Sequence, residues 1–242
     1  VNKEPVPVMT DDMYLDLTRT GSRKICGRIR GIRARAFHNL VLAECLENKG
    51  RFIRKIEQYI QSFLDMKTWI GPPHDSSLAN FKGKYISVDL MAVLTANQLS
   101  AAYSLLKPKL NPALKVRLKS DIERRIINPY LKHCRAGNAG EGFWWLIGTN
   151  NWTAVCNAGV VYAAVIIADS KEVRAEVIAC ALENIKNFLK GFSEDGYCSE
   201  GIGYWVYGYG NFLFMGEVLK RYADGRINVF DSPKAKKAAL FP

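Results

Sequence analysis

Residues 153–168 (TAVCNAGVVYAAVIIA) form the segment that most constrains how this chain can fold, because it is apolar nearly all round. A helix without a polar face has to be enclosed by other elements, since each apolar side chain left in water forgoes stabilisation. Its most apolar run, 158–168, has about half of the ~20 residues that a membrane-spanning helix needs. We therefore expect a buried core helix and no insertion into a membrane.

Amphipathic helical patterns flank this segment on both sides. One apolar stripe recurs every four residues, at Leu114, Leu118, Ile122 and Ile126, and then continues through Ile127, Tyr130 and Leu131. Further helices are expected at 22–48, at 51–66, at 87–106 with Ser87 as the N-cap, and at 173–189. No pair of segments alternates polar and apolar residues as neighbouring strands do.

These patterns predict a single all-α domain over residues 1–242. Helices of roughly 15–25 residues follow one another through short links, and the amphipathic ones can cover the apolar one. We interpret this as an incomplete (α/α) toroid of antiparallel helical hairpins rather than a four-helix bundle. Hydrophobic residues make up 48% and charged residues 24% of the chain, which is typical of soluble globular proteins.

The net charge of +11 favours an anionic partner, and much of it lies in 19–35, where seven basic residues meet no acidic one. Nucleic acid is not expected, because no RNA-binding, zinc-finger or helix-turn-helix signature accompanies the charge. An acidic polysaccharide fits better. Six cysteines without a CxxC pair and three scattered histidines predict neither a disulfide framework nor a metal site, and no cofactor is expected.

Aromatic and amide side chains gather in three loop-like stretches, 69–80, 138–152 and 195–212. Loops with such side chains often form binding sites, and the loops of a toroid would gather at one mouth. The last stretch crowds Gly, Tyr and Trp together, and its glycines would let a sugar chain approach the backbone. Trp144 and Trp145 belong either to the core or to a surface that stacks on sugar rings.

Two adjacent amides, Asn150 and Asn151, precede the apolar helix. One of them is expected to cap the helix N-terminus, whereas the other can donate its NH₂ group to a substrate carboxylate. In the proline turn 72–75, His74 is either structural, with Asp75 orienting it, or part of a site.

Four residues of 195–212 share one face if the next helix already runs at its first member: Glu200, Tyr204, Tyr207 and Asn211. A neighbouring apolar stripe, which includes Trp205 and Leu219, can take the core role. An alternative interpretation uses the carboxylates of the loops as a glycosidase pair, drawn from Glu141, Glu194, Asp195 and Glu200. No spacing in the sequence singles out one pair.

Three motifs carry a resemblance to a known family: T-N-N-W at 149–152, D-G-Y-x-x-E-G-x-G-Y-W-x-Y-G at 195–208, and P-P-H-D at 72–75 followed by S-V-D-L at 87–90. With them the chain resembles the heparinase II/III-like polysaccharide lyases and the related helical-toroid alginate lyases, over most of 69–219. The resemblance implies a catalytic (α/α) toroid followed by a β-sandwich domain. Such enzymes cleave uronic-acid polysaccharides by β-elimination, in the periplasm or after secretion.

Carried over to single residues, the resemblance implies that Asn151 neutralises the substrate carboxylate. It also implies that Tyr207 is the catalytic tyrosine, with Tyr204, one turn earlier, as the alternative. Seven further side chains are expected to contact the substrate: Asn150, Trp152, His74, Glu200, Trp144, Trp145 and Asn211. Several family members follow the Asn with a His, where this chain has Trp152, and no His follows residue 208.

The missing later histidine, and the lack of a strand-rich region after the helix start at 231–233, lead us to expect a fragment of a larger lyase. Two other functions stay open at this point. One is an (α/α) glycoside hydrolase that uses Glu200 or Asp195 in a carboxylate pair. The other is a non-catalytic module that binds glycans.

Overall fold

The structure, a computed structural model, describes residues 4–137 and 140–241, so the first two residues of the expected loop 138–152 lie outside it. The described residues are helical and contain no strand, only an isolated antiparallel bridge between Phe192 and Cys198. The α-helices are α1 (Asp11–Thr20), α2 (Lys24–Glu47), α3 (Ile53–Leu64), α4 (Leu90–Leu106), α5 (Pro112–Ile122), α6 (Asn128–Ala136), α7 (Asn151–Ile167), α8 (Lys171–Lys190), α9 (Ile202–Tyr222) and α10 (Pro233–Ala239). Shorter helical turns are η1 (Pro72–His74), η2 (Glu123–Ile127, a π-helix), η3 (Trp144–Leu146) and η4 (Val229–Asp231).

The predicted all-helical fold is confirmed, and the expected helices form with two corrections. The helix expected at 87–106 begins at Leu90, because Asp89 rather than Ser87 accepts the cap hydrogen bond from Ala92 N. Ser87 instead donates to the side-chain oxygen of Asn80. The helix of the 195–212 stretch begins at Ile202, so the condition under which Glu200 would share a helical face with Tyr204 is not met.

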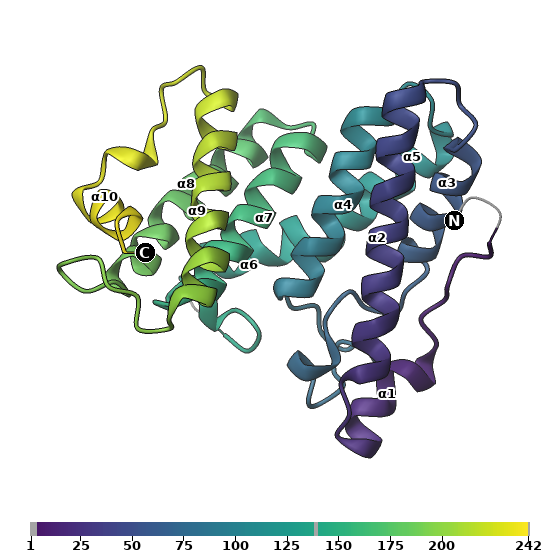
Figure 1. Ribbon diagram of the computed structural model, residues 1–242, viewed down its shortest axis with the longest axis horizontal. Helices are drawn as coiled ribbons and strands as arrows, with labels where there is room; N and C mark the ends of the chain where they lie inside the picture. The colour runs from purple at the N-terminus through teal and green to yellow at the C-terminus, as the bar shows by residue number, and fades with distance from the viewer. Residues whose placement is uncertain (1–3, 138–139, 242) are drawn as a thin grey trace.

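The apolar segment forms α7, and it is enclosed as expected. α7 packs against α4, α8 and α9, and Figure 1 shows it in the middle of the molecule between α4 and the α8–α9 pair. Gly159 allows this close packing, because a Cβ there would lie 2.5 Å from Val93 Cβ on α4. Among the described residues, no helix is both long enough and apolar enough to cross a bilayer.

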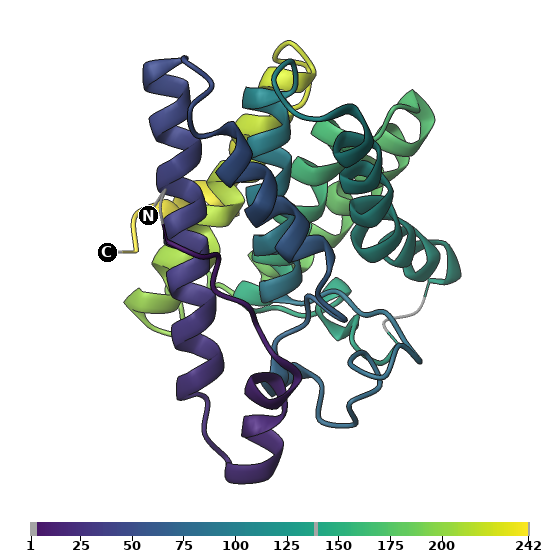
Figure 2. The same ribbon diagram turned by 90° about the vertical axis from the view of Figure 1, so that its right-hand side faces the viewer.

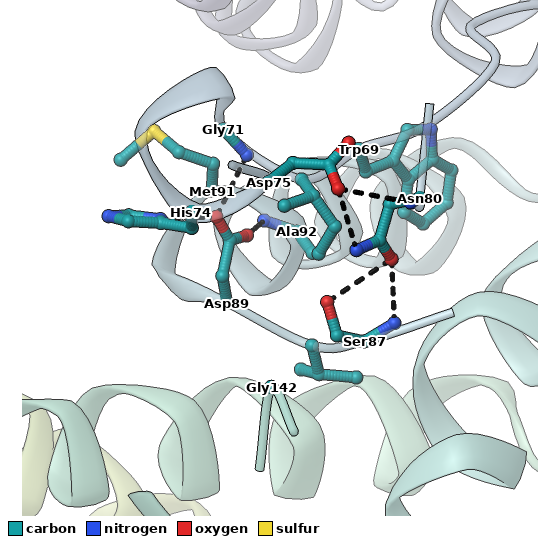
Figure 3. A network of polar contacts seen from close by, with 12 residues as sticks. Trp69, Gly71, His74, Asp75, Asn80, Ser87, Asp89, Met91, Ala92 and Gly142 are labelled. Atoms are coloured by element: carbon teal, nitrogen blue, oxygen red, sulfur yellow. Dashed lines mark hydrogen bonds and ion pairs between the residues drawn. The ribbon is translucent and has the colours of Figure 1, made fainter. Parts of the chain in front are cut away.

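An irregular segment, 65–89, connects α3 to α4 and is held by buried polar groups (Figure 3). The Asp75 carboxylate accepts hydrogen bonds from Tyr14 Oη at 3.0 Å and from the backbone amides of Asn80 and Phe81 at 3.0 and 2.9 Å. In Figures 1 and 2 this segment lies with α1 at one end of the helices, the end from which α7 starts. The network therefore fixes a loop beside the beginning of the central helix.

Glu44 is a buried carboxylate that ties the end of α2 to the next turn. It accepts hydrogen bonds from Gly50 N at 2.8 Å, from Phe52 N at 3.2 Å and from the ammonium group of Lys109. Burial alone would raise the pKa of Glu44, but the hydrogen bonds from Lys109 and from the two backbone amides outweigh it and lower the pKa.

Replacing Glu44 by Gln is expected to lower the free energy of unfolding at neutral pH by about 1.5–3 kcal/mol, because hydrogen bonds to a charged group are lost. The stabilisation by Glu44 is present above the ordinary carboxyl pKa of about 4.3 and is lost as the pH falls through the depressed folded-state pKa. Urea unfolding at several pH values measures both effects. The surface control Glu47→Gln should change stability by less than about 1 kcal/mol. Parallel pH curves for the wild type and Glu44→Gln would contradict this account.

Candidate active site at the start of α7

At the N-terminus of α7, the two adjacent asparagines, Asn150 and Asn151, have different roles. Asn150 is the N-cap, and its side-chain oxygen accepts a hydrogen bond from Trp152 N at 3.1 Å. Asn151 is the first helical residue and is 4% exposed. Because Asn150 satisfies the helix end, the Asn151 amide is left for other partners.

Asn151 holds the carboxylate of Glu200 at two points. Its backbone N–H donates to Glu200 Oε2 at 2.9 Å, and its Nδ2 donates to Oε1 at 2.8 Å. Glu200 is exposed and precedes α9, so it does not lie on the helical face that it was expected to share with Tyr204. A side-chain amide and a helix N-terminus thus already form a carboxylate-binding geometry at the surface.

Gly208, in the 195–212 stretch, lets α9 pack closely against the start of α7. A Cβ at Gly208 would lie 3.0 Å from Asn151 Cβ, so the two backbones approach closely. This contact places Tyr207, the preceding residue, next to the start of α7. Tyr207 is 37% exposed. Burial, followed by the neighbouring Cys156 and Asp89, raises the pKa of the Tyr207 phenol to about 12.

His74 is oriented by a carboxylate, but not by the one that the sequence indicated. Its Nδ1 lies 2.6 Å from Asp89 Oδ2, whereas Asp75 binds groups of its own loop. Asp89 is buried and is fixed by the backbone amides of Gly71 at 2.8 Å and Ala92 at 2.7 Å (Figure 3). With Nδ1–H donating to this carboxylate, the Nε2 of neutral His74 is the proton-accepting nitrogen.

Sequence reasoning did not identify Asp89 as a site residue. It stands 15 residues after His74 and also caps α4. The only signal that pointed to it was the S-V-D-L motif of the family resemblance, which contains this residue at its third position.

Two of the expected aromatic residues join His74. Its ring centre lies 4.6 Å from that of Trp152, in an edge-on contact, and Trp152 lies 5.1 Å from Trp144. Trp144 is exposed. Trp145 is placed elsewhere: it is fully buried, donates to Val88 O at 2.8 Å and stacks on a core tyrosine. The structure therefore puts Trp144 and Trp152, but not Trp145, beside the candidate site.

The remaining predicted residues lie further along α9 and in the loop before it. Tyr204 is exposed, one turn before Tyr207, and Asn211 donates its Nδ2 to Tyr207 O at 2.8 Å. Of the other loop carboxylates, Asp195 binds within its own turn at Tyr197 N, and Glu194 pairs with a lysine of α10. Neither is hydrogen-bonded to the cluster at the start of α7.

No family model matches this chain, and no curated protein matches it significantly. The candidate site is therefore defined by its geometry. Within the described ranges, 4–137 and 140–241, no group of three or more His, Cys, Asp or Glu side chains is arranged to hold a metal ion. A separate hollow of about 980 Å³, between the N-terminal segment, α3 and α5, has none of the site residues in its lining.

The raised pKa of Tyr207 gives a direct titration test. The difference in tyrosinate absorbance between the wild type and Tyr207→Phe should have its midpoint near pH 12, rather than at the ordinary value of about 10. Because folding raises this pKa, the contribution of Tyr207 to stability is complete below pH ~10 and is lost as the pH rises through ~12. A midpoint at the ordinary value would show that the phenol is solvated like that of a free tyrosine.

Proposed function

We propose that this chain is the helical catalytic domain of a polysaccharide lyase that cleaves a uronate-containing acidic polysaccharide by β-elimination. The observation that carries the proposal is the meeting, at the start of α7, of three kinds of group. They are a carboxylate-binding amide (Asn151), a histidine oriented by a buried carboxylate (His74 with Asp89), and a protonated phenol (Tyr207).

The chemistry of β-elimination needs these three groups. A base removes the proton from the carbon next to the uronate carboxylate, and the electrons of that bond form a carbon–carbon double bond as the glycosidic bond breaks. The carboxylate has to be neutralised before this proton becomes acidic enough, and the departing oxygen has to gain a proton. All atoms and charges balance without a cofactor.

We assign the neutralising role to Asn151 together with the positive end of α7. One N–H of its side-chain amide is engaged by Glu200, and an amide has a second N–H to donate. Glu200, by holding the amide, fixes the direction in which this second N–H points. The substrate carboxylate would then bind beside Glu200 rather than replace it.

We assign the two proton transfers to Tyr207 and His74, whose side chains lie beside the start of α7. A phenol with a raised pKa keeps its proton at neutral pH, so Tyr207 is suited to donate a proton to the departing oxygen. His74 Nε2, with Asp89 on the opposite nitrogen, is suited to accept the substrate proton. Trp152 stands where several members of the resembling family have a histidine, and it packs against His74, which supplies an imidazole from another loop.

The helix packing and the charge support the same class of protein. α4 and α9 both pack on α7, while α3 pairs with α2 and α8 with α7, as expected for hairpins of an (α/α) toroid. Four basic residues of the 19–35 region are exposed and form no ion pair within the described part of the chain: Arg23, Lys24, Arg28 and Arg35. They favour an anionic chain as the substrate.

The proposal is tested by incubating the full chain with heparan sulfate, hyaluronan and alginate and recording ultraviolet absorbance. Elimination creates a double bond conjugated with the carboxylate, and hydrolysis does not. We expect absorbance to rise with at least one of these polymers and to stay flat with a neutral glucan. Cleavage of a polymer without the chromophore would overturn the proposal in favour of a hydrolase.

A further inference from the structure

Two free thiols meet where the end of α6 packs against the middle of α8. Cys134 lies in the last turn of α6 and Cys180 lies halfway along α8, and both residues are half-buried. The Cys134 thiol donates a hydrogen bond to the sulfur of Cys180. Neither residue belongs to the cluster at the start of α7, and the proposed function uses neither of them.

The helix packing holds the two thiols face to face. Glu176, Cys180 and Asn184 lie on one side of α8, because residues four apart are neighbours on a helix surface. One turn before Cys180, Glu176 accepts hydrogen bonds from Arg135 Nε and Nη2, both at 2.6 Å. One turn after it, Asn184 Nδ2 lies 4.0 Å from Cys134 Sγ. Contacts on both sides of Cys180 therefore fix the end of α6, and with it Cys134, against this part of α8.

The pair can be reached from outside the protein. A hollow of about 220 Å³ has both cysteines in its wall, together with Leu146, Ile147 and Glu183. Ile147 and Glu183 are exposed, so the hollow lies at the surface rather than in the core. A small thiol reagent can therefore meet the two sulfur atoms without unfolding of the helices.

The two thiols differ in how readily they lose a proton. Burial, followed by the neighbouring Cys180, raises the pKa of Cys134 to about 12. Burial also raises the pKa of Cys180, but the hydrogen bond from Cys134 acts in the opposite direction, because it stabilises the Cys180 thiolate. The thiolate is the reactive form of cysteine. Cys180 is therefore the sulfur that attacks first, and Cys134 is the one that attacks second.

We propose that Cys134 and Cys180 are a redox site that a small disulfide, glutathione disulfide, converts into a disulfide bridge between α6 and α8. The Cys180 thiolate attacks one sulfur of glutathione disulfide, whose S–S bond breaks and releases one glutathione thiolate. The Cys134 thiolate then attacks the Cys180 sulfur of this mixed disulfide and releases the second glutathione thiolate. Two electrons pass from the protein to the reagent, and the two released thiolates take up the two protons. The site is independent of the proposed lyase activity.

The bridge would close a loop of about 45 residues that contains the whole of α7, so it restricts the unfolded chain and stabilises the fold. The full chain is incubated in mixtures of reduced and oxidised glutathione, alkylated, and mapped by mass spectrometry. Of the six cysteines, we expect two to be lost as free thiols, with one linked peptide pair that contains Cys134 and Cys180. The midpoint of thermal unfolding should rise by roughly 5–10 °C. Glutathione attached to single cysteines, with no Cys134–Cys180 link at the most oxidising ratio, would overturn the proposal.

Three matched variants assign the change to this pair. Cys134→Ser and Cys180→Ser should each abolish the linked peptide and the rise in the unfolding midpoint, because one sulfur is missing. Cys45→Ser removes an exposed cysteine of α2 and should leave both effects unchanged. A midpoint that still rises with glutathione disulfide in Cys180→Ser would show that another modification stabilises the protein, and would contradict the assignment.

Discussion

Replacing Tyr207 by phenylalanine is expected to lower the rate of glycan cleavage by about 10²–10⁴-fold, because the departing glycosidic oxygen loses its proton donor. Tyr207 is partly exposed and, as no hydrogen bond to its hydroxyl is formed within the described residues, removal of the hydroxyl should leave the fold intact. Initial rates from the ultraviolet assay, together with circular dichroism of both proteins, measure the effect on activity separately from any effect on folding.

Tyr204→Phe is the matched control, since Tyr204 lies one turn earlier on the same helix and is 56% exposed. Its loss is expected to change the rate by less than about threefold, because the Tyr204 side chain is more exposed than that of Tyr207. A large loss in Tyr204→Phe combined with a nearly normal rate in Tyr207→Phe would show that Tyr204 is the catalytic tyrosine.

The second large effect is expected at the His74–Asp89 pair. His74→Gln should lower the cleavage rate by about 10²–10⁴-fold, because glutamine cannot accept the substrate proton. In His74→Ala, added imidazole should restore part of the activity. A structural role of His74 alone predicts no such rescue, so activity that stays flat as imidazole is added would count against His74 as the base.

Asp89→Asn separates the orientation of His74 from the capping of α4. Asparagine is as good an N-cap as aspartate, so α4 should persist, while the backbone N–H of Gly71 loses its acceptor and stability should fall by about 1–3 kcal/mol. The rate should still fall by at least about 10²-fold, because an amide does not stabilise the imidazolium or hold the productive tautomer. A variant that remains folded at the assay temperature while its activity falls would support a positioning role, and normal activity would exclude it.

The helices could be predicted because their cause is local. The apolar residues of α8 and the 114–131 stretch recur at helical spacing, and that spacing needs no knowledge of the tertiary fold. The exact helix starts were less predictable. Asp89 caps α4 instead of Ser87 because Asn80, seven residues earlier, binds Ser87. The residue that caps α4 therefore depended on how the whole segment 65–89 folds.

The site could be predicted in part. Asn151 and Tyr207 were predicted from short motifs, and Gly208 brings the two together by removing a side chain between α7 and α9. The expected role of the glycines in admitting a sugar chain is not what Gly196 and Gly208 do. A Cβ at Gly196 would lie 2.3 Å from Lys237 O, so both glycines admit other parts of the protein. The partner of His74 depended on how 75–89 folds, which no local pattern states.

The central claim is that the enzyme cleaves by elimination rather than by hydrolysis. It is tested most directly by digesting a uronate polymer in water enriched in the heavy isotope of oxygen and measuring the product masses by mass spectrometry. Hydrolysis places one oxygen atom of water in each product pair, whereas elimination adds none and leaves an unsaturated uronate at the new non-reducing end. We predict that the fragment with the new non-reducing end is lighter than its hydrolysis counterpart by one molecule of water, once the exchange of the reducing-end oxygen with water is corrected for. A new non-reducing end that has no double bond, and is therefore heavier by one molecule of water, would contradict the account.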